Sequence, residues 1–135
     1  MSKDKTLTYP DIEIYLADTT NDEIVDWLAT ILSDINLTRS SRNNGTCHYS
    51  ARCSHQQGEV EIGFMVVENA NGSFTSLWFK TGQTPWSSDL ECARAAADQF
   101  HGEIRCSPGP WDPDQDNDEW ISIQNAHEST IIWRS

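Results

Sequence analysis

Carboxylates gather in one proline-rich stretch near the C-terminal end of the sequence. Residues 107–113 contain three prolines and a glycine, which disfavour regular secondary structure. The acidic side chains that alternate through and after them are Asp112, Asp114, Asp116, Asp118 and Glu119. Carboxylates held in one loop repel each other, and a cationic partner relieves that repulsion. The stretch predicts an exposed acidic loop that binds a basic protein partner.

Alternating carboxylates also occur at the start of calcium-binding loops, where the first, third and fifth positions supply oxygen ligands. Counted from Asp112, the position that requires glycine holds Asn117, and the position that requires a bidentate glutamate holds Ile123. Counting from Asp114 fits worse. The ligand set is incomplete, so we expect a solvated acidic loop and no bound metal or other cofactor.

Two tryptophans lie beside prolines in the expected loops, Trp86 and Trp111. Aromatic rings next to carboxylates form recognition surfaces, so both residues join the acidic loop as candidate partner-binding residues. The competing interpretation is that these rings cover the ends of a small core. A second functional hypothesis is a small-molecule site or enzyme, with a pocket between the second helix and the sheet lined by Trp86, Trp111 and Cys106.

Two cysteines and two histidines, the residue types that bind zinc, lie within nine residues: Cys47, His48, Cys53 and His55. In an extended strand both cysteines point to one face and His48 points to the other, which does not give tetrahedral ligation. We therefore expect free, half-buried thiols. The sequence contains no nucleophile elbow, glycine-rich phosphate loop or metalloprotease motif. A cysteine–histidine pair remains open as a catalytic arrangement, with Cys53, Cys92 or Cys106 beside His48, His55 or His101.

The whole chain is acidic: its 135 residues carry a formal net charge of −12. This charge argues against direct binding of nucleic acid, which requires clustered lysine and arginine. It fits a basic partner, a solubilising role or a saline habitat. The longest apolar run, residues 63–67, is too short to span a membrane. The N-terminus lacks a secretory apolar segment, which predicts a cytoplasmic protein with a flexible leader at residues 1–10.

The stretch from Glu59 to Trp86 organises the expected fold. Two apolar strands flank Asn71-Gly72, a pair typical of tight hairpin turns, and their apolar residues predict a place in the middle of a sheet. Before them, alternation predicts strands at residues 11–17 and 46–55, and residues 36–46 are expected to form a loop or hairpin turn. After the helix that follows Trp86, we expect a strand at 103–106 and a closing hairpin of 120–123 with 130–133.

Two capping boxes mark the expected helices. Thr20-x-x-Glu23 precedes apolar residues at helical spacing, which predicts a helix over 21–35, and Ser88-x-x-Glu91 begins a second helix. Gly102 is expected to end that second helix in the left-handed conformation.

The resulting order, β-α-β-β-β-α-β-β-β, predicts a single α+β domain over residues 11–135. We expect a mainly antiparallel sheet with both helices packed on one face, loosely ferredoxin-like in element order with extra strands. The expected core comprises Ile12, Ile14, Leu16, Ile24, Leu28, Ile31, Val60, Ile62, Phe64, Val66, Trp78 and Phe100.

Overall fold

The computed structural model describes residues 11–41, 45–55, 58–108 and 118–133. Along the chain the elements are β1 (Ile12–Ala17), α1 (Asn21–Leu28), β2 (Ser33–Ser41), β3 (Thr46–His55), β4 (Gly58–Asn71), β5 (Phe74–Phe79), α2 (Asp89–Gln99), β6 (Ile104–Cys106), β7 (Glu119–Gln124) and β8 (His127–Ile132). The predicted leader, residues 1–10, lies outside the described residues. The division into a leader and one domain stays a prediction.

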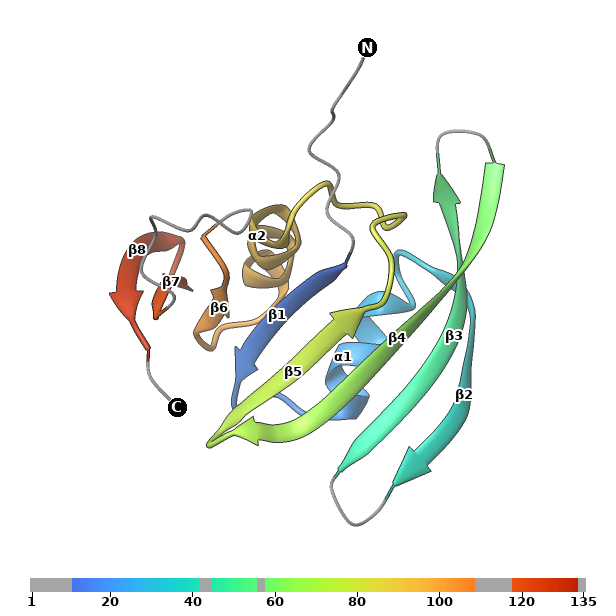
Figure 1. Ribbon diagram of the computed structural model, residues 1–135, viewed down its shortest axis with the longest axis horizontal. Coiled ribbons are helices and arrows are strands. Elements are labelled where there is room, and N and C mark those ends of the chain that lie inside the picture. Colours follow the sequence, from blue (N-terminus) through green and yellow to red (C-terminus); the bar gives the residue numbers. More distant parts are fainter. Residues whose placement is uncertain (1–10, 42–44, 56–57, 109–117, 134–135) are drawn as a thin grey trace.

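The eight strands form one sheet in the order β2-β3-β4-β5-β1-β6-β7-β8, with every neighbouring pair antiparallel (Figure 1). The structure is therefore mainly antiparallel sheet with two helices. The β4–β5 hairpin has paired strands on both sides, as its apolar pattern predicts. Asn71 pairs with Phe74, so Gly72 and Ser73 form the loop, one residue later than expected. Gly72 adopts a φ of 62°, which glycine tolerates without steric cost.

The first helix is shorter than predicted. It ends at Leu28 instead of residue 35, and the expected loop at 36–46 is largely the strand β2. The prediction was wrong because β2 lies at the edge of the sheet with most of its residues exposed, so it shows no alternation of apolar and polar side chains. Two register shifts against β3 weaken the pattern further. Ile31, assigned to the core from its helical spacing, is 39% exposed.

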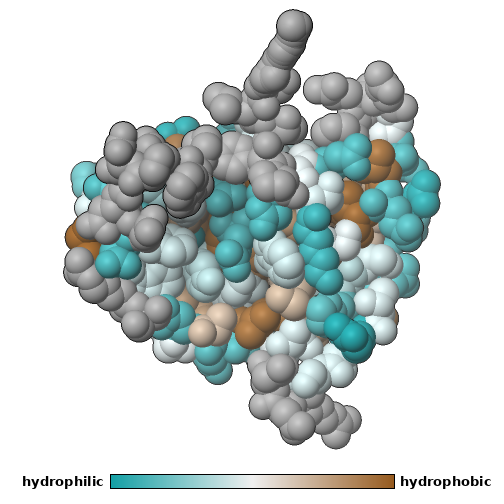
Figure 2. Space-filling model, in the orientation of Figure 1, coloured by the Kyte–Doolittle hydropathy of each residue, from teal (hydrophilic) through white to brown (hydrophobic). Residues whose placement is uncertain are grey.

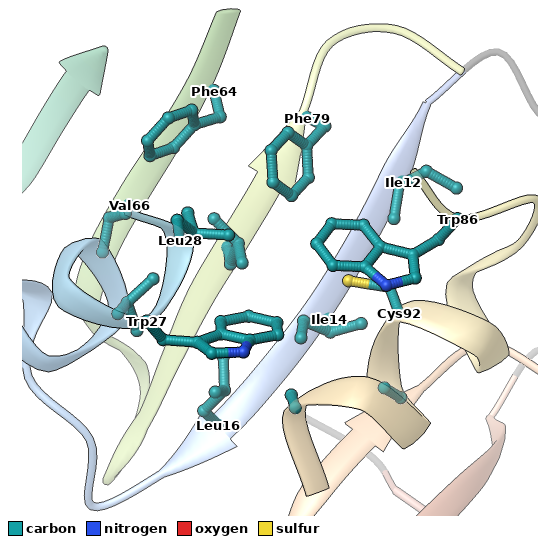
Figure 3. Close-up of a cluster of buried hydrophobic side chains, with 14 of the residues drawn as sticks. Ile12, Ile14, Leu16, Trp27, Leu28, Phe64, Val66, Phe79, Trp86 and Cys92 are labelled. Atoms are coloured by element: carbon teal, nitrogen blue, oxygen red, sulfur yellow. The ribbon is translucent and has the colours of Figure 1, made fainter. Parts of the chain in front are cut away.

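Both helices cover the same face of the sheet. In Figure 1, β4 and β5 pass in front of α1, and Figure 3 shows the buried side chains between the helices and the strands. Ile14 of β1, Leu28 of α1 and Cys92 of α2 are fully buried in this one cluster. The predicted core residues found there are Ile12, Ile14, Leu16, Ile24, Leu28, Ile62, Phe64 and Val66, with Val60 and Phe100 half-buried against them.

Trp78 is the other exception to the predicted core. It alternates with the buried Leu77 and Phe79, so it lies on the helix-free face, where its indole N–H donates to Asp11 at 2.8 Å. Figure 2 shows this face: hydrophilic and near-neutral residues cover most of it, and hydrophobic residues form small separate patches. The Arg105 guanidinium lies there between the rings of Phe74 and Trp133, at 4.5 and 4.6 Å from their centroids.

The second helix begins at its predicted cap and ends differently from the prediction. Ser88 accepts a hydrogen bond from the backbone N–H of Glu91, and the helix ends with Phe100 in an extended conformation. Gly102 does not have a positive φ, so it is not a left-handed stop. It is required for packing instead, because a Cβ at this position would lie 2.7 Å from the carbonyl oxygen of Ala17.

Candidate functional site

The predicted acidic loop lies mostly outside the described residues, which exclude Trp111, Asp112, Asp114 and Asp116. Asp118 and Glu119 are half-buried at the start of β7, and the Asp118 carbonyl accepts the backbone N–H of Trp133 at 2.8 Å. Both residues make further interactions. The role of the loop in docking therefore stays a prediction.

Trp86 belongs to the core and does not offer a binding surface. It is 8% exposed, stacks on Trp27 at a centroid distance of 5.6 Å and contacts Phe79. The competing interpretation of this tryptophan, as a cover for the core, holds. Cys106 is also fully buried in the same cluster, so these two residues do not line an open pocket between α2 and the sheet.

The cysteines are all free thiols, and three of them are poor nucleophiles. Burial raises the pKa of Cys53, raises that of Cys92 well above its usual range, and raises that of Cys106 to about 12. A thiol reacts as the thiolate, so these environments disfavour nucleophilic catalysis. Among the described residues there is no group of three or more side chains suited to hold a metal ion.

A pocket of about 480 Å³ lies where the end of β1, the helix α1 and the C-terminal end of α2 meet. Its volume is within the range of small-ligand sites. Its aromatic part comes from Trp27 and Phe100, whose rings meet edge to face at 5.7 Å. Its other lining residues are Ala17, Asp18, Thr19, Glu23, Asp26, Thr30, Gln99, His101 and Gly102. We refer to it as the α1–α2 pocket.

Local sequence explains how the chain places these residues. Asp18 turns the chain out of β1 with a φ of 52°, a conformation that aspartate tolerates better than most residues. Thr20 then caps α1, where it accepts the backbone N–H of Glu23 at 3.2 Å. One turn later, Trp27 lies on the buried side of the helix and Asp26 on its exposed side. Carboxylates therefore stand around the mouth of a pocket with aromatic walls.

The carboxylates at this mouth form no ion pair with any described residue. Asp18 and Asp26 form no ion pair there, and Glu23 uses one oxygen to accept the backbone N–H of Thr20 at 2.9 Å. The described arginines are engaged elsewhere: Arg52 with Glu59, Arg94 with Glu128, Arg105 with Glu103 and Arg39 with His48. The pocket can therefore bind a cation by uncompensated charge and by contact with aromatic rings.

A second hollow, of about 530 Å³, lies on the other side of the start of α1. Asp22 and Glu68 contribute its carboxylates, and Glu68 accepts the backbone N–H of Asn21 at 2.7 Å. The half-buried Cys47 also lines it. Acidic groups thus flank the first turn of α1 on both sides.

The sequence contained a signal for this site that residue-by-residue motif reading missed. Between Lys5 and Arg39 there is no lysine, arginine or histidine, whereas the carboxylates there are Asp11, Glu13, Asp18, Asp22, Glu23, Asp26 and Asp34. This charge asymmetry marks the surface around α1. Trp27 could not be assigned to a pocket from sequence, because its helical spacing is equally typical of the core.

A separate group of carboxyls lies at the start of β1. β6 pairs with residues 14–16 of β1, so it does not reach Glu13. The Asp89 carboxylate accepts the backbone N–H of Glu13 at 3.2 Å instead. Burial raises the pKa of Asp89 to about 6, and the nearby charges of Asp11 and Glu13 also raise it.

We expect Asp89→Asn to remove part of the pH dependence of stability. Because its pKa in the folded protein exceeds its ordinary value of 3.8, Asp89 stabilises the fold while protonated, and that stabilisation is lost as the pH rises from about 4 to about 6. The amide oxygen of Asn can still accept the Glu13 N–H. Urea unfolding at several pH values should show the variant gaining stability relative to the wild type across this interval. If the difference in unfolding free energy between the two proteins did not change with pH, the raised pKa would be wrong.

Comparison of the chain with protein-family models, with curated proteins and with solved structures finds no significant match. Within the described residues, neither helix is long and apolar enough to cross a membrane.

Proposed function

We propose that the protein is a binding protein that holds a basic protein partner through the carboxylates around α1 and the α1–α2 pocket. The observation that carries the proposal is the lack of cationic partners for Asp18 and Asp26 among the described residues, beside a pocket with aromatic walls. A lysine or arginine side chain of the partner supplies the missing charge.

Physical considerations favour a cation over other ligands. Like charges close together on one surface raise the free energy of the unbound protein, and a cation lowers it on binding. The same field speeds association at low salt, and screening weakens it over about 8–10 Å at physiological ionic strength. Binding should therefore weaken as salt is added. The same negative field disfavours nucleic acid as a direct partner.

We expect the double variant Asp18→Asn/Asp26→Asn to bind a fluorescein-labelled hexa-arginine peptide about two- to thirtyfold more weakly than the wild type, since each of the two exposed charge pairs contributes about 0.2–1 kcal/mol. Fluorescence anisotropy at low salt gives the dissociation constants. Neither residue is used in a helix cap, and Asn tolerates the φ of Asp18, so the fold should be retained.

The control is Glu59→Gln/Glu61→Gln, which removes the same net charge from exposed positions on β4, although Glu59 differs from the two tested residues in being paired with Arg52. It should change the affinity much less. Equal weakening by both double variants would show that only net charge matters, and the proposed location would be wrong. A labelled hexa-citrulline peptide, which is neutral, should not bind measurably.

The predicted acidic loop remains a second part of this proposal. Asp112, Asp114, Asp116, Asp118 and Glu119 would extend the negative surface, and changing the first four to Asn tests that role by the same titration. A surface made acidic by a saline habitat instead predicts evenly spread carboxylates and no partner; the clustering around α1 favours binding. A small-molecule ligand remains the alternative, now in the α1–α2 pocket.

The loosely ferredoxin-like element order adds nothing to the functional proposal. That likeness is one of element order, and folds of this kind host many unrelated activities. A cytoplasmic location likewise stays a prediction from the N-terminal sequence.

A further inference from the structure

Two cationic side chains of this acidic protein lack a carboxylate partner among the described residues, and both contact the same histidine. The described lysine and arginine residues are Arg39, Arg52, Lys80, Arg94 and Arg105. Three of them pair with glutamates, whereas Arg39 and Lys80 form no ion pair with any described residue. Their nitrogens lie 3.1 and 3.5 Å from the two ring nitrogens of His48. Both charges are therefore left uncompensated in a chain whose net charge is −12.

The register of the sheet brings these three side chains to one face. His48 on β3 pairs with Arg39 on β2 and with Met65 on β4, and Met65 pairs with Trp78 on β5. Directly opposed residues of antiparallel strands point to the same side, so this row lies on the helix-free face with Trp78. Lys80 follows Trp78 by two residues, and its ammonium lies 5.8 Å from the centroid of that ring. We refer to the group as the Arg39–His48–Lys80 cluster.

His48 cannot satisfy both of its cationic neighbours. A guanidinium and an ammonium only donate hydrogen bonds, and a neutral imidazole has one accepting nitrogen and one N–H. The shorter contact makes Nε2 the acceptor for Arg39, so Nδ1 carries the proton and faces the Lys80 ammonium. The other tautomer moves the mismatch to Arg39, and a protonated ring faces donors on both sides. In every protonation state of the ring, a donor therefore meets a donor.

The charges around His48 also oppose its protonation. Partial burial lowers the pKa of His48, and the positive charges of Arg39 and Lys80 lower it further. On the two neighbouring strands, the residues opposite His48 are Arg39 and the uncharged Met65, so neither strand places a carboxylate there. A negative charge brought to the cluster would relieve the repulsion among its groups.

We infer that the Arg39–His48–Lys80 cluster binds a tetrahedral oxyanion, the phosphate or sulfate group of a small ligand, on the helix-free face of the sheet. One oxygen accepts from the His48 Nδ1–H and from the Lys80 ammonium, which replaces the donor–donor contact. Another oxygen accepts from the Arg39 guanidinium in a charge-assisted hydrogen bond. A phosphate or sulfate ester offers three terminal oxygens to the three donor groups, whereas a carboxylate offers two.

The cluster is suited to a single anionic group. Binding of a nucleic-acid backbone requires many phosphate contacts, which two cations do not supply. The cluster also lies on the face of the sheet opposite α1, so this inference is independent of the proposed use of the α1–α2 pocket.

The test follows the four histidine side chains of the ¹⁵N-labelled protein by NMR. Sodium sulfate, sodium phosphate and sodium acetate are added to separate samples at equal ionic strength, and the His48 signal is the one absent from His48→Gln. We expect sulfate and phosphate to shift the His48 signal saturably and acetate to shift it little. The anion that binds more tightly identifies which of the two groups the ligand carries.

A pH titration gives a second measurement on the unchanged protein. Sulfate stays a dianion across the range in which histidine titrates, so saturating sulfate should raise the pKa of His48 by about 0.5 or more relative to acetate. The other three histidines should respond less, because neither Arg39 nor Lys80 contacts them within the described residues.

Arg39→Gln and Lys80→Gln should each weaken sulfate binding about two- to fivefold, as expected for the loss of one exposed charge contact. Both side chains are exposed, so the substitutions should leave the fold intact. The matched control is Arg52→Gln, because Arg52 carries the same charge on the same face of β3 and is already paired with Glu59. It should leave the affinity for sulfate nearly unchanged.

Three results would overturn the inference. Equal shifts of His48 in acetate and in sulfate would show a general effect of salt without a site. Equal weakening by Arg52→Gln and Arg39→Gln would show that only net charge matters. If sulfate left the pKa of His48 unchanged, no anion would be bound at this ring. None of these results bears on the α1–α2 pocket, which the hexa-arginine titration tests separately.

Discussion

Replacing Leu28 with alanine is expected to lower the free energy of unfolding by about 2–5 kcal/mol, the range found for leucine deletions in packed cores. Leu28 is fully buried in the last turn of α1, between the helix and the sheet (Figure 3). Truncation removes apolar contacts and leaves a cavity that the neighbouring aromatic rings cannot fill. Urea denaturation monitored by circular dichroism gives the change directly.

Ile31→Ala is the matched control for this measurement. The helical pattern of the sequence places Ile31 in the same core, whereas the structure leaves it 39% exposed beyond the end of α1. We expect a loss of about 1 kcal/mol or less, as for most partly exposed positions. If Ile31→Ala destabilised the protein as much as Leu28→Ala, the helix would continue past Leu28 and the boundary between α1 and β2 would be wrong.

Gly102→Ala should destabilise the protein by about 1–3 kcal/mol, the usual range for overpacking a tight site. The added Cβ would lie 2.7 Å from the carbonyl oxygen of Ala17, and backbone on both sides leaves no flexible side chain to move away. The backbone N–H of Ala17 also donates to the Glu103 carbonyl at 2.8 Å, so separating the two segments strains that hydrogen bond. Thermal unfolding should show the loss.

Gly63→Ala provides the comparison, because the same methyl group is added in the middle of β4. Its nearest neighbour would be the carbonyl oxygen of Tyr49 at 3.7 Å, an ordinary van der Waals distance. The change should be small and could be stabilising, since alanine restricts the unfolded chain. Similar losses at Gly102 and Gly63 would mean that the close approach at Ala17 does not exist.

Local signals predicted most of the described elements. The two capping-box patterns located both helix starts, at Thr20 and Ser88, and alternation located β1 and β3. The first box is complete, whereas at the second the Glu91 carboxylate accepts from Ser87 and not from the backbone N–H of Ser88. These signals work because cap hydrogen bonds and strand periodicity depend on residues close in sequence. The closing hairpin was also found, with Asn125 and Ala126 at its turn in positive φ.

The features that failed depend on distant contacts. An edge strand with both faces exposed shows no alternation of apolar and polar residues, so β2 was not predicted. Gly102 was given a helix-ending role because its close neighbour, Ala17, is remote in sequence. Trp86 was named as a candidate binding residue because it follows Pro85 in an expected loop, with burial over the core as the competing interpretation; Trp27 and Phe79 bury its ring.

The sequence predicted the type of partner, a basic one, but not the location of the candidate site. The net charge indicated a basic partner. The α1–α2 pocket forms only where the end of β1, the helix α1 and the end of α2 lie together, and their relative positions depend on the pairing of strands across the whole sheet. Taken from the sequence alone, Asp18 and Asp26 are ordinary exposed charges before and within α1; only the fold brings Phe100 and Gly102 into the same pocket lining.

The most direct test of cation binding at this pocket is a map of backbone amide shifts during titration of the ¹⁵N-labelled protein with hexa-arginine at low salt. The proposal predicts that the largest saturable shifts fall on Asp18, Thr19, Glu23, Trp27 and His101, and that added salt reduces them together. Largest shifts on β4 and β8 instead, with the residues of the α1–α2 pocket unchanged, would contradict it.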